Sequence, residues 1–147
     1  MTFPQQRLRR LRKSGAIRRL ISETTLSVDD FVAPLFVREG ITEPQPIASL
    51  PGVFQHTRDS LKGEIDQIRN LGIPSIILFG IPAEKDATGS GAWDPNGIVQ
   101  QAIADCKSVT GDDLLIMSDL CVDEYTDHGH CGVVNDDGSI DNDLTLD

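Results

Sequence analysis

The feature that most constrains the fold is a set of three short apolar runs separated by two amphipathic helical patterns. The runs span residues 30–37, 75–79 and 113–118, and their length and apolar character are typical of buried strands. Between them, residues 59–71 and 94–109 repeat their apolar positions at the spacing of a helix. Apolar strands alternating with helices predict an α/β protein with a parallel sheet covered by helices on its faces.

Local signals predict where these elements begin and end. Asp94 and Pro95 predict the start of the second helix, with Asp94 as its N-cap and Pro95 in the first helical position. Pro34 predicts an end or a bulge in the first strand, because proline cannot donate to the ladder. We expect residues 40–58 and 80–97 to be loops, the second one long and mobile, and the second does not have the glycine pattern of a phosphate-binding loop.

Charge is distributed unevenly along the chain, whose formal net charge is −10. Seven of the 13 Lys and Arg residues lie between residues 7 and 19, where there is no acid. An acidic protein is repelled by nucleic acid, and this segment lacks the aromatic residues that stack on bases, so we expect no nucleic-acid partner. We expect the basic segment to dock on an acidic surface of this chain or of a neighbour. An organelle transit peptide is the weaker alternative, because the segment has only one serine.

The cysteines and the apolar segments predict the compartment. No apolar stretch approaches the roughly 20 residues of a membrane span, and no secretory signal follows the basic start, so we expect no membrane partner. Three cysteines, an odd number, argue against a disulfide framework and favour a reducing, cytoplasmic setting. Cys106 falls on the apolar stripe of the second helix, where we expect a buried, unreactive thiol.

The stretch SDLCVDEYTDHGHCG, residues 118–132, follows the third predicted strand directly and concentrates potential metal ligands. Asp119, Cys121 and Asp123 alternate along the chain, so they point to one face if the strand continues. Cys131 could fold back to supply a further ligand. Thiolates and carboxylates both bind zinc, and three protein ligands with one open position is the arrangement of a catalytic zinc site.

Two histidines in the same stretch leave an alternative open. His128 and His130 could join Cys121 and Cys131 in a closed, four-ligand structural site. These residue types favour metal binding but do not decide between a catalytic and a structural site. The third histidine, His56, lies in a predicted loop, where we expect it to be exposed to solvent.

Beyond these local signals, SDLCVDEYTDHGHCG resembles the metal-binding signature of the porphobilinogen synthase (5-aminolevulinate dehydratase) family. The preceding sequence resembles the family's N-terminal arm, first strand and following segments, and the resemblance covers nearly the whole chain in order. The segments that carry it are RLRRLRKSGAIRRLISETTLSVDDFVAPLFV, PIASLPGVFQHTRDSL and LGIPSIILFGIPAEKDATGSGAWDPNGIVQQAI. The resemblance implies an oligomerisation arm in residues 1–28 and, in residues 29–147, the N-terminal part of a (β/α)8 TIM barrel. Such arms wrap a neighbouring subunit, generally in a homo-octamer.

The same resemblance implies a function and a set of site residues. The family condenses two molecules of 5-aminolevulinate to porphobilinogen, with loss of two waters, in tetrapyrrole and heme biosynthesis. Its zinc-type members present Asp-x-Cys-x-Cys followed by Tyr-Thr-x-His-Gly-His-Cys-Gly, and Asp123 replaces the middle cysteine here. The resemblance therefore implies Cys121, Asp123 and Cys131 as metal ligands and Asp119 as the catalytic aspartate. A carboxylate in place of a thiolate makes Mg²⁺ conceivable beside Zn²⁺.

The chain of 147 residues is shorter than the roughly 250 residues of a TIM barrel. A fourth barrel strand is expected to begin after Asp141. The resemblance implies an N-terminal fragment, inactive alone, because the family's two Schiff-base lysines belong to later strands. None of the lysines here occupies their positions: Lys13, Lys62, Lys85 and Lys107. Two other classes stay open: a zinc-stabilised binding module, and a regulatory partner that co-assembles with full-length subunits through its arm.

Overall fold

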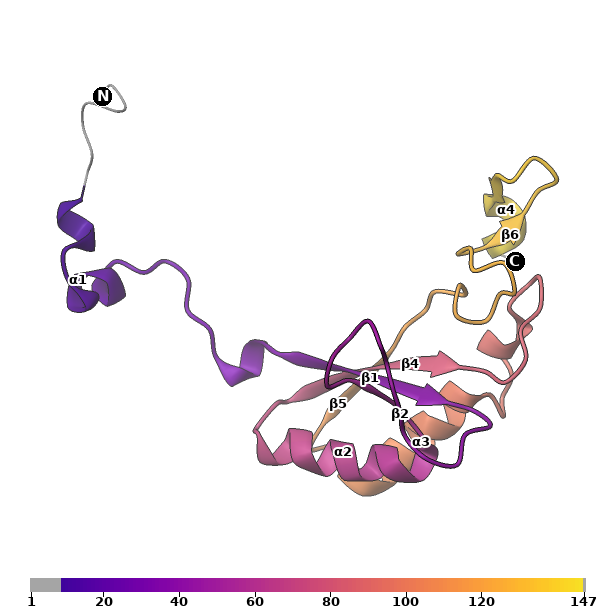
Figure 1. Cartoon of the computed structure of the whole chain (residues 1–147), viewed down its shortest axis with the longest axis horizontal. Helices are drawn as coiled ribbons and strands as arrows, with labels where there is room; N and C mark the ends of the chain where they lie inside the picture. The colour runs from indigo at the N-terminus through magenta and orange to yellow at the C-terminus, as the bar shows by residue number, and fades with distance from the viewer. Residues whose placement is uncertain (1–8, 147) are drawn as a thin grey trace.

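The computed structural model describes residues 9–146 and contains a five-stranded sheet with helices α2 and α3 on one face (Figure 1). The strand order is β2-β3-β1-β4-β5; β2 and β3 are antiparallel, and the other neighbouring pairs are parallel. The predicted alternation of strands and helices in a parallel sheet is confirmed. In chain order the elements are η1 (Arg10–Arg12), α1 (Gly15–Leu20), η2 (Val28–Asp30), β1 (Val32–Arg38), β2 (Gln45–Pro46), β3 (Phe54–His56), α2 (Arg58–Asn70), β4 (Ser75–Ile81), η3 (Ser90–Ala92), α3 (Ile98–Thr110), β5 (Leu115–Ser118), β6 (Val133–Val134), β7 (Ile140–Asp141) and α4 (Asn142–Leu146).

The hydrophobic core lies between one face of the sheet and helices α2 and α3. Alternate residues of β1 and β4 point into it, because successive side chains of a strand face opposite sides. The buried core side chains are Leu35, Val37, Leu61, Ile65, Ile68, Ile76, Leu78, Ile98, Val99, Ala102, Cys106 and Leu114. Cys106 is confirmed as a buried thiol, and burial raises its pKa to about 11. Thr57 begins α2 by accepting the Ser60 amide, with the Ser60 hydroxyl accepting in return from Thr57.

The opposite face of the sheet carries a second apolar row, which we call the inner face: Pro34, Phe36, Ile77, Phe79 and Met117. The register aligns Pro34 with Ile77 and Met117, and Phe36 with Phe79, whose rings stack 5.2 Å apart. In residues 9–146 no helix covers this face, so the prediction of helices on both faces is wrong for the described part of the chain. In a TIM barrel, inward-pointing side chains from the parallel strands fill the interior, those of alternate strands stacking in layers.

Several local predictions are wrong because pairing partners distant in sequence intervene. Residues 40–58 are not entirely loop, since β3 pairs with the end of β1. His56 ends β3 and is 7% exposed, with its Nδ1 3.3 Å from the Ser60 hydroxyl. Pro34 lies inside β1 without a bulge, because β3 pairs only with Phe36 and Val37 and leaves Pro34 unpaired on that side.

Two predicted element starts are also wrong. Helix α3 begins at Ile98 with Gly97 as its N-cap, because the Asp94 carboxylate instead accepts the Asn96 amide in a preceding turn. After Asp141 the chain forms helix α4 rather than a fourth barrel strand.

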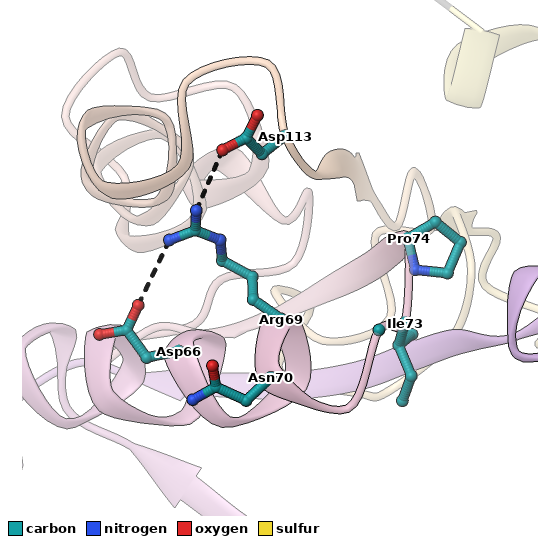
Figure 2. A pocket seen from close by; sticks show the side chains of 7 residues that line it. Asp66, Arg69, Asn70, Ile73, Pro74 and Asp113 are labelled. Carbon is teal, nitrogen blue, oxygen red and sulfur yellow. Dashed lines mark hydrogen bonds and ion pairs between the residues drawn. The ribbon is translucent and has the colours of Figure 1, made fainter.

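Two sets of charged contacts hold the helices in place. Near the end of α2, Arg69 binds Asp66 of the same helix and Asp113 of the loop before β5, at 3.5 and 3.0 Å (Figure 2). The hollow around this guanidinium therefore contains a cation that two carboxylates already neutralise.

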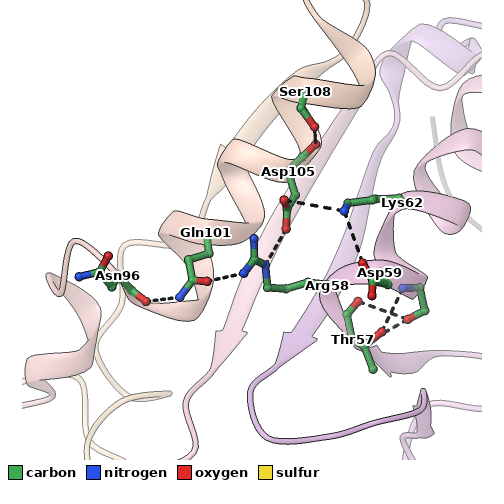
Figure 3. A network of polar contacts seen from close by, with 9 residues as sticks. Thr57, Arg58, Asp59, Lys62, Asn96, Gln101, Asp105 and Ser108 are labelled. Atoms are coloured by element: carbon green, nitrogen blue, oxygen red, sulfur yellow. Dashed lines mark hydrogen bonds and ion pairs between the residues drawn. The ribbon is translucent and has the colours of Figure 1, made fainter.

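At the other end of α2, Asp105 of α3 accepts from Arg58 at 2.6 Å and lies 3.9 Å from Lys62 (Figure 3). Arg58 also donates to Gln101, so the first turn of α2 is connected to two successive turns of α3.

The basic segment extends away from the sheet (Figure 1). Residues 1–8, including Leu8, lie outside the described residues. Ser14 separates η1 from α1 and caps α1 by accepting the Ile17 amide at 3.2 Å. Leu11 and Leu20 are 54% and 85% exposed, so this apolar surface lacks a cover in the described part of the chain. Among residues 9–146 there is no helix with the length and hydropathy to cross a bilayer.

Candidate metal centre

The stretch with potential metal ligands leaves the sheet at the carboxyl end of β5, on the side where the β6–β7 hairpin lies (Figure 1). The strand ends at Ser118, so the alternation on which the sequence argument depended does not continue. Instead, the Val122 carbonyl accepts the amides of Tyr125 and Thr126 at 2.9 and 3.0 Å. A tight turn thus replaces the expected extended backbone.

A second turn returns the chain toward its start. The Thr126 hydroxyl donates to the His130 carbonyl at 2.9 Å, which directs Cys131 back toward Cys121. One ligand atom each from Cys121, Asp123 and Cys131 lies within 4.8 Å of the others. Cys131 is exposed and the other two are partly buried, so the group is accessible from solvent. The structure brings these three residues together, and their role as metal ligands stays a prediction.

The Cys121 and Cys131 thiols lie close enough to influence each other's ionisation. The hydrogen bond with Cys131 is the main cause that raises the pKa of Cys121 to about 12, and the nearby Asp123 carboxylate adds to the effect. The raised pKa means that Cys121 favours its protonated form. A bound cation would favour the thiolate instead, because metal binding requires deprotonated thiols and releases their protons. The donor set of two sulfurs and one carboxylate therefore fits a metal ion chemically.

Asp119 does not belong to this group of three. Its amide donates to the Leu78 carbonyl at 3.0 Å, and its carboxylate accepts the Leu120 amide at 2.9 Å. Glu124 is a nearby acid that sequence reasoning missed. Burial, followed by the negative charges of Asp119 and Asp123, raises its pKa to about 7, and its Oε2 is buried without a hydrogen-bond partner. The signal in the sequence that points to Glu124 is its position directly after Asp123.

The two histidines do not close a four-ligand site. His128 Nδ1 accepts the His130 amide at 3.1 Å, so its Nε2 carries the proton and donates to the Ala87 carbonyl at 3.1 Å. Both ring nitrogens of His128 are therefore engaged. The structural-site alternative, which needs His128 and His130 as ligands beside the cysteines, receives no support from this arrangement.

Comparisons with known proteins agree on one family. The family model for delta-aminolevulinic acid dehydratase matches residues 5–147. The delta-aminolevulinic acid dehydratases of Streptomyces coelicolor, Mycobacterium tuberculosis and Escherichia coli are 52%, 47% and 47% identical to this chain. Each alignment covers 99% of this chain but only 44%, 45% and 44% of those relatives. The chain therefore spans less than half the length of the curated relatives it matches.

A solved structure gives the same result for the fold. The delta-aminolevulinic acid dehydratase (porphobilinogen synthase) of Toxoplasma gondii, crystallised with the reaction product porphobilinogen, superposes with a TM-score of 0.87 at 33% identity. The match covers 97% of this chain and 41% of that one. The predicted α/β fold, part of a (β/α)8 barrel, is confirmed.

Proposed function

The chain belongs to the delta-aminolevulinic acid dehydratase family, and we propose that it provides the N-terminal part of a porphobilinogen synthase. That enzyme condenses two 5-aminolevulinate molecules to porphobilinogen in tetrapyrrole biosynthesis. The observation that carries the proposal is the convergence of Cys121, Asp123 and Cys131 beyond the carboxyl end of a parallel strand. Barrel enzymes assemble their active sites at this end of the strands.

We propose Zn²⁺ as the metal that these three residues bind. Two sulfur ligands favour zinc, whereas Mg²⁺ prefers oxygen ligands alone and is the second candidate because of the Asp123 carboxylate. Three protein ligands leave one coordination position for substrate or water. When bound, the metal would supply a Lewis acid that polarises a substrate carbonyl or activates a water.

The chain's own side chains orient the substrate. Asp119 directly follows β5, and its amide donates to the Leu78 carbonyl of the neighbouring strand, which fixes the backbone from which its carboxylate extends. We propose that it orients or protonates a substrate amine. Imine formation needs a desolvated lysine, but Lys62 lies in ion-pair range of Asp59 and Asp105. The two Schiff-base lysines would belong to the part of the relatives' length that this chain does not match.

The remaining surfaces suit an assembled, oligomeric enzyme. We propose that further barrel strands cover the inner face and that the arm, residues 1–28, contacts a neighbouring subunit in a homo-octamer. The exposed apolar side chains and the basic charge of the described arm residues support that role. We place the enzyme in the cytoplasm, because its thiols are free and a thiol metal site needs a reducing setting.

The test compares this chain alone with a fusion to the portion of the S. coelicolor relative that it does not match. We expect the fusion to form porphobilinogen in a colorimetric assay with Zn²⁺ present, and the chain alone to form none. The same fusion with Asp119→Asn is the control and should lose turnover while still binding metal. A folded fusion that forms no product with either Zn²⁺ or Mg²⁺ contradicts the proposal.

A further inference from the structure

The loop between β4 and α3 lies against the segment that carries the potential metal ligands. Asp86 donates its amide to the Tyr125 carbonyl at 3.3 Å, and its carbonyl accepts the Asp127 amide at 3.0 Å. Between these two bonds, Asp86 and Thr126 form an isolated parallel bridge. We call residues 86–91 the Asp86 turn; its first residue, Asp86, is thus paired with residues 125–127 through the backbone.

The Asp86 side chain organises its own turn. One carboxylate oxygen accepts the amide and hydroxyl of Thr88, at 2.9 and 3.0 Å, and the amide of Ser90 at 3.1 Å. The other oxygen accepts the Ser90 hydroxyl. The hydrogen bonds from Ser90, followed by those from Thr88, hold the pKa of Asp86 well below its usual range. The carboxylate is therefore ionised at neutral pH and accepts all four bonds.

The turn also fits closely against the neighbouring segment. Gly89 has a φ of +72°, and a Cβ there would lie 3.2 Å from the Thr126 methyl and 3.3 Å from the Val122 carbonyl oxygen. The His128 ring donates to the Ala87 carbonyl, which adds a further hydrogen bond between the Asp86 turn and the segment that carries the potential ligands. Every one of these contacts falls between Cys121 and Cys131, in the segment that must fold back for the thiols to meet.

We propose that Asp86 is a positioning residue for the metal centre, and this inference rests on the proposed function. Its carboxylate shapes the Asp86 turn, and the backbone of that turn holds residues 125–128 in the conformation that returns Cys131 to Cys121. Asp86 is not itself among the three clustered ligands. A preformed loop lowers the entropic cost of metal binding, because less chain must be ordered when the ion arrives.

The experiment titrates the full chain with Co²⁺, a spectroscopic probe of thiolate ligation, under reducing conditions. Asp86→Ala should weaken Co²⁺ binding by about tenfold, the lower end of the range for residues supporting a metal site. At saturation the cobalt–thiolate absorption should persist, since both sulfurs remain. Asp86→Asn should bind nearly as the unmodified chain does, because its side-chain oxygen still accepts the Thr88 and Ser90 amides.

The matched control is Asp94→Ala, which removes a similar turn from the same loop. Asp94 accepts the Asn96 amide at 2.8 Å in the turn that precedes α3, and no hydrogen bond among the described residues connects Asp94 to residues 121–131. Its Co²⁺ affinity should equal that of the unmodified chain. Circular dichroism and urea unfolding report whether each variant is folded.

The outcomes separate the inference from the proposed function. Failure of the folded, unmodified chain to bind Co²⁺ or Zn²⁺ overturns the metal centre itself. Binding by the unmodified chain with equal affinity in folded Asp86→Ala overturns only the positioning role. If Asp86→Ala does not fold, the Co²⁺ affinity of Gly89→Ala tests the positioning role instead. The added Cβ would crowd Thr126 while the Asp86 carboxylate stays intact. Weaker binding by this variant supports the inference, and unchanged affinity contradicts it.

Discussion

At the scale of single residues, Asp123 has the largest influence on which cation the proposed centre accepts. It supplies a hard oxygen beside two soft sulfurs, and all three ligand atoms lie within 4.8 Å of one another. In the zinc-type signature that residues 118–132 resemble, a third cysteine stands at this position. As a ligand of the proposed centre, Asp123 would balance affinity for Zn²⁺ against tolerance of Mg²⁺.

Replacing that carboxylate should change metal selectivity in a defined direction. Asp123→Cys should tighten Zn²⁺ binding on the order of tenfold, about 1.4 kcal/mol, and reduce competition by Mg²⁺. Competition titrations with a chromophoric chelator measure both effects. The control Asp123→Ser should weaken both metals, and equal Zn²⁺ affinity in all three proteins would show that Asp123 is not a ligand.

His56 predicts a pH dependence of stability. Burial lowers its pKa below the ordinary 6.5, partly offset by Glu64, so the folded chain holds this imidazole neutral. The resulting stabilisation is complete above pH 6.5 and is lost as the pH falls through the lowered folded-state pKa. His56→Gln keeps a polar partner for Ser60 and should remove this loss. Urea unfolding above and below pH 6.5 measures this loss of stability. If the variant loses as much stability at low pH as the unmodified chain, His56 is not the group responsible.

At the scale of elements, helices α2 and α3 are held together by apolar packing and by the contacts of Asp105. Its partners Arg58 and Lys62 lie one turn apart on α2, so a single carboxylate sets the rotation of one helix against the other. The Asp66–Arg69 pair, by contrast, lies within one helix, with Asp66 exposed and Arg69 partly exposed. The two pairs therefore make a natural comparison between tertiary and local ion pairs.

Asp105→Ala should lower the free energy of unfolding by about 1 kcal/mol, because its partner Arg58 is partly exposed and recovers hydration. Asp66→Ala should change it by much less, since exposed pairs within a helix contribute only about 0.3–0.5 kcal/mol. Chemical denaturation at low and high salt measures both values. A salt-independent loss in Asp105→Ala would show that packing rather than charge is responsible.

At the scale of the whole molecule, the sheet is covered on one face only. Phe36, Phe79 and their neighbours form an apolar inner face that no helix of residues 9–146 covers, and β5 is an edge strand in the described part. Apolar surface beside an unpaired edge promotes association. The fold of residues 9–146 thus creates a surface that further barrel strands would bury.

We expect the isolated chain to self-associate through this face. Phe79→Ser should shift sedimentation of the isolated chain toward monomer, whereas in the fusion with the S. coelicolor segment it should lower stability by leaving a barrel layer unfilled. The control Leu71→Ser removes an apolar residue that is 68% exposed at the end of α2 and should change neither measurement. Equal association of the isolated chain in all three proteins would exclude the inner face.

The sequence by itself determined the order of strands and helices, the parallel sheet, the burial of Cys106 and the position of the ligand-rich stretch after β5. These features depend on periodicity and on neighbours in the chain, which a sequence displays directly. Only the tertiary structure decided that His56 is buried, that Pro34 lies inside a strand and that Asp86 contacts the ligand-bearing segment. Each depends on residues far along the chain: the pairing of His56 with Val37 of β1, the short β3 that leaves Pro34 unpaired, and the backbone of residues 125–127. The convergence of Cys121 and Cys131 was also decided by the tertiary structure. It comes from turns held by hydrogen bonds, which the spacing of residues in the sequence does not specify, and a continued strand would have kept the two thiols apart.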